Sequence, residues 1–208
     1  MLTGDCGAFL EGLHNIDQDV TAAINSLHVP ATDTFWCTLS NKFIWIPMYL
    51  IIIGFFFWKL GWKKALFVLL ACSLTFAFCD QLATFIQFIV RRERPDVDVE
   101  MTQRGLNYLE PVYKKYIYGF FSAHAANAIG FAVCSYMGFK NNQSLNCRPY
   151  GWFIFIWAIL VGISRIFVGK HFLGDVLTGF AVGLLAGWIF SLLARWAIRK
   201  VDTKRQAI

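Results

Sequence analysis

Long apolar segments dominate the pattern of hydrophobic and polar positions along this chain. A helix needs about 20 apolar residues to cross the hydrocarbon core of a bilayer. About five segments approach that length, at residues 43–58, 65–90, 119–139, 151–168 and 172–198. The pattern therefore predicts an all-α integral membrane protein, a helical bundle with about five transmembrane helices.

The first 41 residues follow a different pattern. Apolar residues recur there at steps of three or four, which is the spacing of one stripe on a helix; they are Phe9, Leu13, Ile16, Val20, Ala23 and Leu27. Polar residues occupy the other positions, and Pro30 ends the pattern. Because the segment is too polar to span, we predict an amphipathic helix lying in the membrane interface. A helix packed on the outside of the bundle is the alternative.

The composition agrees with a membrane protein. Hydrophobic residues make up 57% of the chain and charged residues 15%, whereas soluble domains carry about 25% charged residues. The net charge of +6 does not indicate nucleic-acid binding, because the bases lie in short segments between apolar spans. No linker divides the chain. We expect a single domain, 1–208, made of an amphipathic segment (1–41), a transmembrane bundle (42–198) and a basic cytoplasmic tail (199–208).

The positions of Lys and Arg predict an orientation, since short cytoplasmic loops are enriched in these residues. With five spans, the basic turns after spans one and three and the basic tail all fall on one side, which we expect to be cytoplasmic. The loop between spans two and three falls on the outer side, yet it carries Arg91, Arg92, Arg94, Arg104, Lys114 and Lys115. An anionic substrate would explain this exception.

Polar side chains gather where the fourth span ends and the fifth begins. Ser164 and Arg165 end the fourth span, His171 opens the fifth, and Asp175 lies one helical turn beyond His171 on the same face. A carboxylate there accepts the imidazole Nδ1–H and leaves Nε2 free as a nucleophile. Charges inside a membrane are costly and usually functional. A structural His–Asp pair at a helix start is the alternative.

Two further polar segments lie at span ends on the same outer face. The sequence Phe-Ser-Ala-His (121–124) opens the third span, and Arg94-Pro95 follows the second. Together with Arg165 and His171, they offer two imidazoles and two guanidinium groups. Arg presents a planar bidentate fork to phosphate, and helix N-termini attract anions. The combination suits an anionic substrate.

These three segments resemble the motifs of the type 2 phosphatidic acid phosphatase (PAP2) family, which shares its site with the vanadium haloperoxidases. The family pattern is Lys-x6-Arg-Pro, then Pro-Ser-Gly-His, then Ser-Arg-x5-His-x3-Asp. The third part is matched in full between Ser164 and Asp175. The second part has Phe121 and Ala123 in place of Pro and Gly, and the first has Gln87 in place of Lys. The resemblance covers about residues 80–175.

The resemblance implies a role for each matched residue. His171 attacks phosphorus and becomes phosphohistidine, Asp175 orients His171, and His124 protonates the leaving alkoxide and then activates water. The implied phosphate-binding groups are Arg94, Arg165, Ser122 and the backbone N–H of Ala123. The resemblance implies no metal and no cofactor.

Gln87 offers an amide where the family pattern has a positive charge. Arg91 lies one helical turn from Gln87 and Arg92 is its neighbour, so we expect Arg91 or Arg92 to compensate; a less charged site is the alternative. Gln87 and Arg91 therefore join the phosphate-binding candidates.

Several other polar or small residues have structural interpretations. We expect Asp80, inside the second span, to make a structural hydrogen bond, with tuning of the site as the alternative. Lys170 is interpreted as a substrate contact or, equally, as a headgroup or solvent contact. Gly179, Gly183 and Gly187 form overlapping GxxxG steps, which let helices approach closely. We expect these to pack within one chain rather than to form a dimer.

The sequence thus predicts a lipid phosphate phosphatase that hydrolyses a phosphomonoester or pyrophosphate on a membrane lipid. The resemblance suggests undecaprenyl pyrophosphate, phosphatidylglycerol phosphate, phosphatidic acid or lipid A as substrate. We expect a multi-pass protein of a bacterial inner (cytoplasmic) membrane, with its active site facing the periplasm or outer face. A lipid-to-lipid phosphotransferase and a catalytically weak lipid-phosphate binding protein are the alternatives. The oligomeric state is left open.

Overall fold

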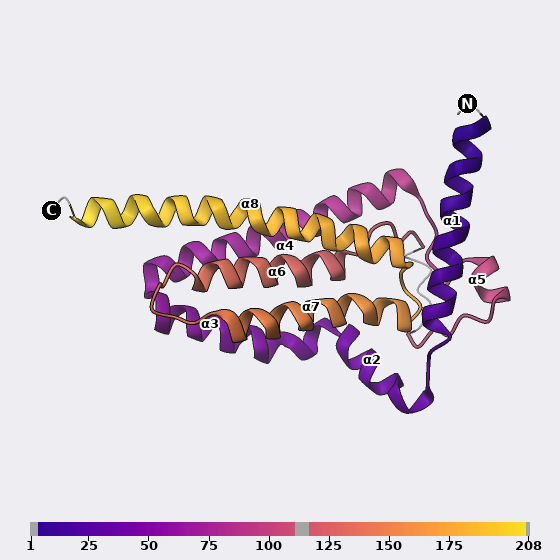
Figure 1. Ribbon diagram of the computed structural model, residues 1–208, viewed down its shortest axis with the longest axis horizontal. Coiled ribbons are helices and arrows are strands. Elements are labelled where there is room, and N and C mark those ends of the chain that lie inside the picture. Colours follow the sequence, from indigo (N-terminus) through magenta and orange to yellow (C-terminus); the bar gives the residue numbers. More distant parts are fainter. Residues whose placement is uncertain (1–3, 111–116, 207–208) are drawn as a thin grey trace.

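Helices make up the fold of the computed structural model, which describes residues 4–110 and 117–206 (Figure 1). They are α1 (Gly4–Asn25), η1 (Pro30–Thr32), α2 (Asp33–Ser40), η2 (Lys42–Trp45), α3 (Ile46–Leu60), α4 (Trp62–Val90), α5 (Val99–Gln103), α6 (Ala123–Phe139), α7 (Arg148–Phe167) and α8 (Leu173–Gln206). In Figure 1, α3, α4, α6, α7 and α8 run along the long axis, and α1 crosses one end of this bundle.

The predicted all-α membrane bundle is confirmed. Among the described residues, four segments are long and apolar enough to cross a membrane: Lys42–Leu60, Trp62–Val90, Arg148–Phe167 and Leu173–Asp202. The predicted third span is α6, which is shorter at 17 residues and packs against α4, α7 and α8. Its many Ala and Gly residues suit this central position, because small side chains let neighbouring helices approach closely.

The glycines of α8 face α6. A Cβ atom at Gly183 would lie 2.1 Å from the carbonyl oxygen of Ala126, and one at Gly179 would lie 2.5 Å from that of Ser122. Neither position has room for a larger residue. The expectation that the GxxxG steps pack within the chain is therefore confirmed.

The N-terminal helix presents its polar face to the protein. Gln18 and Thr21 are 1% and 0% exposed, whereas Phe9 and Ile16 on the apolar stripe are 63% and 60% exposed. Since α1 also crosses the bundle axis in Figure 1, it packs on the end of the bundle and turns its stripe outward. The structure thus combines features of both alternatives for this helix. The short helix α2 was not predicted, because eight residues carry too little periodicity.

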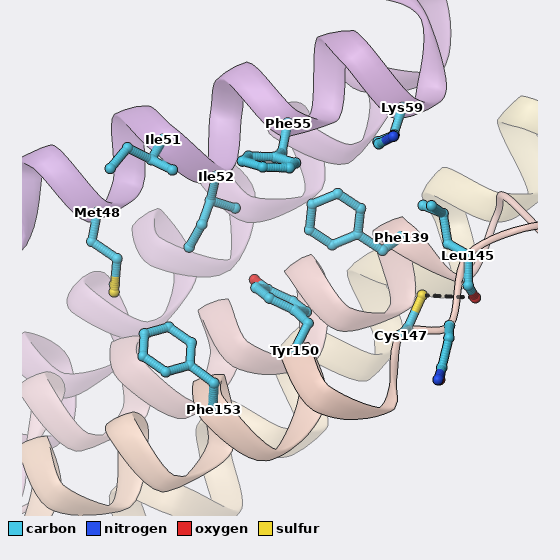
Figure 2. Close-up of a pocket in the computed structure, with 11 residues that line it drawn as sticks. Met48, Ile51, Ile52, Phe55, Lys59, Phe139, Leu145, Cys147, Tyr150 and Phe153 are labelled. Atoms are coloured by element: carbon cyan, nitrogen blue, oxygen red, sulfur yellow. Dashed lines mark hydrogen bonds between the residues drawn. The ribbon is translucent and has the colours of Figure 1, made fainter.

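The opposite end of the bundle carries the basic turns at Lys59–Lys64 and Lys140–Arg148 and the C-terminus. A pocket of about 520 Å³ lies there between α3 and α7. Figure 2 shows the rings of Phe139, Tyr150 and Phe153 facing α3 across it. Lys59 is the charged side chain of its lining.

Candidate active site

Backbone hydrogen bonds join the three motif segments at the end of the bundle that α1 crosses. The N–H of Ser122 donates to the carbonyl of Asp175 at 3.0 Å, and the N–H of Gly119 donates to the carbonyl of Arg92 at 2.9 Å. The N–H of His171 donates to the carbonyl of Arg165 at 3.2 Å. Segments that are far apart in the sequence are therefore held together by the main chain itself.

His171 and Asp175 form the predicted pair. Both are buried, and the imidazole Nδ1 lies 3.4 Å from Oδ2 of Asp175. The same oxygen accepts the N–H of Phe172 at 3.1 Å. Burial, together with the positive charges of Arg94 and Arg165, holds the pKa of His171 well below its ordinary value of 6.5. The imidazole is neutral at pH 7 as a result, which a nucleophile requires.

His124 and the two arginines lie around His171. The charges of Arg94 and Arg165 act electrostatically on both His171 and His124. The guanidinium of Arg94 is anchored through Nε, which donates to the carbonyl of Tyr118 at 3.0 Å. The structure therefore brings together the two imidazoles and two guanidinium groups that the motifs predicted.

Arg165 has two partners that the sequence did not reveal. Its Nη1 donates to the hydroxyl of Ser40 and lies 3.4 Å from Oε1 of Glu110. The Ser40 hydroxyl in turn donates to Glu110 at 2.6 Å. These contacts fix the direction of the buried guanidinium, and they compensate its charge.

Ser122 and Gln87 organise the start of α6. Ser122 is the N-cap, and its hydroxyl accepts the N–H of Ala125 at 3.4 Å. The N–H of Ala123 falls in the first turn, where helical N–H groups have no intrahelical acceptor. Gln87 on α4 donates from Nε2 to the carbonyl of Phe121 at 3.1 Å. Gln87 thus contacts the backbone next to Ser122, a role that an amide performs without a charge.

The structure does not bring Arg91 to this group. Arg91 has a positive φ of 52° at the end of α4, its Nε donates to the carbonyl of Phe88 at 3.2 Å, and its guanidinium lies over the Phe88 ring. The reversal of the backbone at this residue directs Arg92, rather than Arg91, towards Asp175. Compensation for Gln87 was expected from Arg91 or Arg92. The geometry gives no support for Arg91, and the guanidinium of Arg92 pairs with Asp175 and Asp17.

Two other bases of the outer loop and its surroundings have acidic partners. Lys170 is buried, and its Nζ lies 2.7 Å from Oδ2 of Asp96. Arg104 pairs with Asp19 on α1. Lys114 and Lys115, which were predicted to lie in the same outer loop, fall outside the described residues.

Polar residues of α1 were missed as part of this region. The side chain of Asn25 donates to the carbonyls of Ile166 and Asn107 at 3.0 Å and 2.9 Å. Thr21 and Asp17 accept the N–H groups of Leu173 and Gly174. The helical spacing of positions 17, 21 and 25 was the signal, but it identifies a polar face without saying what that face contacts.

A second pocket, of about 380 Å³, opens beside His124. It lies between η2, α3, α4, α6 and α7, and its lining is largely apolar. Asn127 in this lining donates to Oδ1 of Asp80 at 2.7 Å, so the expected hydrogen bond of Asp80 is confirmed. The Oδ1 of Asn127 is buried and accepts no hydrogen bond from the described residues.

Comparisons with known proteins agree with this arrangement. The chain is 32% identical to a lipid A 4'-phosphatase of Bacteroides thetaiotaomicron over 89% of its own length and 80% of that protein. It is also 32% identical to a lipid A 4'-phosphatase of Porphyromonas gingivalis, over 86% of this chain and 72% of that one. The crystal structure of a transmembrane PAP2-type phosphatidylglycerolphosphate phosphatase from Bacillus subtilis superposes with a TM-score of 0.68, over 88% of this chain and 87% of that chain, at 21% identity.

The family is established by the sequence match rather than by the superposition. Residues 64–199 match the PAP2 superfamily, which is more than half of the chain and includes all the predicted catalytic side chains. This chain belongs to the PAP2 superfamily, and its fold is that of the membrane-embedded phosphatases in it.

Proposed function

We propose that this protein is a lipid phosphate phosphatase that works through a phosphohistidine at position 171. The observation that carries the proposal is the buried pair of His171 and Asp175 with two arginines beside it. Phosphoryl transfer depends on positioning and on neutralising the phosphate oxygens, and these groups supply both.

The reaction has two steps. His171 Nε2 forms a bond to phosphorus while the bond to the leaving oxygen breaks, and His124 gives a proton to that oxygen. His124 then takes a proton from water, the water oxygen bonds to phosphorus, and the N–P bond breaks to release phosphate. Arg94 and Arg165, with Ser122 and the Ala123 N–H, hold the equatorial oxygens. A general acid of this kind contributes about 10²- to 10⁴-fold in rate.

The pocket beside His124 suits the leaving group, because His124 is the residue that protonates it. Its polar side chains include Asp80, Asn127 and Lys42. A sugar or glycerol next to the ester oxygen would find hydrogen-bond partners there. With the two lipid A 4'-phosphatases among its relatives, this makes a phosphorylated glycolipid such as lipid A the first candidate substrate.

We further propose that the site faces the periplasm of a bacterial inner membrane. The basic turns and the C-terminus lie at the other end of the bundle, which the positive-inside rule favours as cytoplasmic. We also propose that residues 1–208 act as one domain, since α1 contacts both α7 and α8.

Phosphate release from the detergent-purified protein tests the proposal. The panel holds lipid A, phosphatidylglycerol phosphate, phosphatidic acid and undecaprenyl pyrophosphate. We expect the highest kcat/KM with lipid A, loss of release to background in His171→Gln, and an acid-labile phosphoenzyme in the wild type alone. Release by His171→Gln at the wild-type rate would rule out the nucleophile. Transfer of phosphate to another lipid, without free phosphate, would indicate a phosphotransferase instead.

A further inference from the structure

Arg92 lies behind the proposed catalytic pair and contacts it directly. Its Nη1 donates to Oδ1 of Asp175 at 3.0 Å, the oxygen that His171 does not use. Its guanidinium also lies 3.9 Å from the centroid of the Phe172 ring. Arg92 therefore contacts two residues of the turn that carries His171, one through charge and one through its flat face.

The other edge of the same guanidinium is held by α1. Nη2 of Arg92 donates to Oδ2 of Asp17 at 2.7 Å and lies 3.2 Å from Nδ1 of His14. The second oxygen of Asp17 accepts the N–H of Gly174 at 2.8 Å. One carboxylate of α1 thus fixes both Arg92 and the first turn of α8.

The burial of Asp175 explains why such support is needed. Asp175 is fully buried, and a buried carboxylate is stable only when charge and hydrogen bonds compensate it. Arg92 supplies a full positive charge to the oxygen that faces away from His171. With Arg92 in place, Asp175 stays ionised and its other oxygen stays directed at the imidazole Nδ1, which keeps Nε2 unprotonated towards the substrate.

We propose that Arg92 is a positioning residue for phosphoryl transfer, acting through Asp175, and that Asp17 of α1 holds Arg92 in place. The inference rests on the proposed function for its kinetic test only. If Asp17 holds Arg92, then α1 helps to position the site in addition to lying as an amphipathic helix on the surface of the bundle.

The chain offers a matched control. Arg104 also ties the chain to α1, through Asp19, but the pair is at the surface and does not contact Asp175. We expect Arg92→Gln to lower kcat roughly 10- to 100-fold, by analogy with the loss found when an outer partner of a metal-binding histidine is removed. KM should change little, because the side chain of Arg92 contacts Asp175, Asp17 and Phe172 rather than the proposed phosphate-binding groups. Asp17→Asn should give a smaller loss that is not additive with Arg92→Gln, and Arg104→Gln should leave kcat within about twofold, as surface pairs contribute little.

Three further measurements separate positioning from folding. Guanidinium ion added to Arg92→Ala should restore part of kcat, and Arg92→Gln and Arg104→Gln should unfold at similar temperatures in detergent. In ¹⁵N NMR of the imidazoles, assigned with His171→Gln, Arg92→Gln should shift the His171 signals and Arg104→Gln should not.

The NMR measurement needs no substrate, so it stands even if the wild type hydrolyses none of the lipids and the proposed function fails. Wild-type kcat in Arg92→Gln, absence of guanidinium rescue, or unchanged His171 signals in Arg92→Gln would each overturn the inference.

Discussion

Several charged side chains at the end of the bundle crossed by α1 are buried and paired, whereas the ion pair at the opposite end lies at the surface. Arg165, Lys170 and Asp175 are each at most 5% exposed and have charged partners. At the far end, Lys64 pairs with Asp202, and both are about a third or more exposed. Burying an ion costs several kcal/mol unless it is compensated. Charge at the first end thus needs a functional reason, while charge at the second is explained by topology.

The pockets differ in the same way. The far pocket is the larger and almost wholly apolar (Figure 2), whereas the pocket beside His124 includes an acidic, an amide and a basic side chain. Between these two pockets, volume alone would favour the one that lies away from His124. The chemistry of the lining, and the titratable groups around it, identify the site.

Removing one positive charge from each end of the bundle should give the largest difference in kcat/KM. Arg165→Ala removes a guanidinium from the proposed phosphate site, and we expect kcat/KM to fall by about 10²- to 10³-fold. Lys59→Ala at the far pocket should leave kcat/KM within about twofold. Phosphate release from lipid A measures both. Similar losses in the two variants would show that the ends are not functionally distinct.

A change in the packing between α6 and α8 should act on stability. Gly183→Ala places a methyl group against the carbonyl of Ala126, and overpacking of this kind costs about 1–3 kcal/mol. Gly54→Ala in α3 meets no atom within 4 Å and serves as the control. Thermal unfolding in detergent should show a lower midpoint for Gly183→Ala only. An equal midpoint for both would contradict the tight contact.

Position 87 should show a smaller effect on turnover. Gln87→Lys restores the charge of the family pattern, and we expect turnover to be kept or raised. Arg91→Ala should change turnover by less than about twofold, because the Arg91 side chain contacts Phe88 rather than the site. Loss of turnover in Gln87→Lys would indicate that the hydrogen bond from the Gln87 side-chain amide to the Phe121 carbonyl is indispensable.

The titration of His171 tests, in the unsubstituted protein, whether the end of the bundle crossed by α1 is as buried and as positive as the structure indicates. Burial and the two arginines disfavour the protonated imidazole, so its pKa lies well below 6.5. On lowering the pH from 8, His171 should therefore stay neutral through pH 6.5 and gain its proton only below that. NMR of the labelled imidazole follows the protonation directly. A midpoint at or above 6.5 would mean that the site is wetter or less positive than the structure indicates.

Prediction from the sequence was most successful where a pattern is local. Apolar length indicated the spans, and the Ser164–Asp175 motif located His171 and its carboxylate. His171 was expected on the helix itself, but it lies in the turn before α8, and Asp175 reaches back to it from the first turn of that helix. Prediction was least successful where a side chain reaches another element. Arg91 and Arg92 are neighbours in sequence, and only the left-handed backbone at Arg91 decides which of them faces Asp175.

The chain by itself determined a helical membrane protein and the chemical groups of its site. The length of an apolar segment and the spacing of residues within a motif are local properties, so they can be recognised without knowing which segments pack together. The tertiary structure decided what the polar face of α1 contacts, which arginine supports Asp175, and which acid holds Arg165. Those choices depend on which residues distant in the sequence are brought within hydrogen-bonding distance, and burial then makes each such contact obligatory for the charges involved.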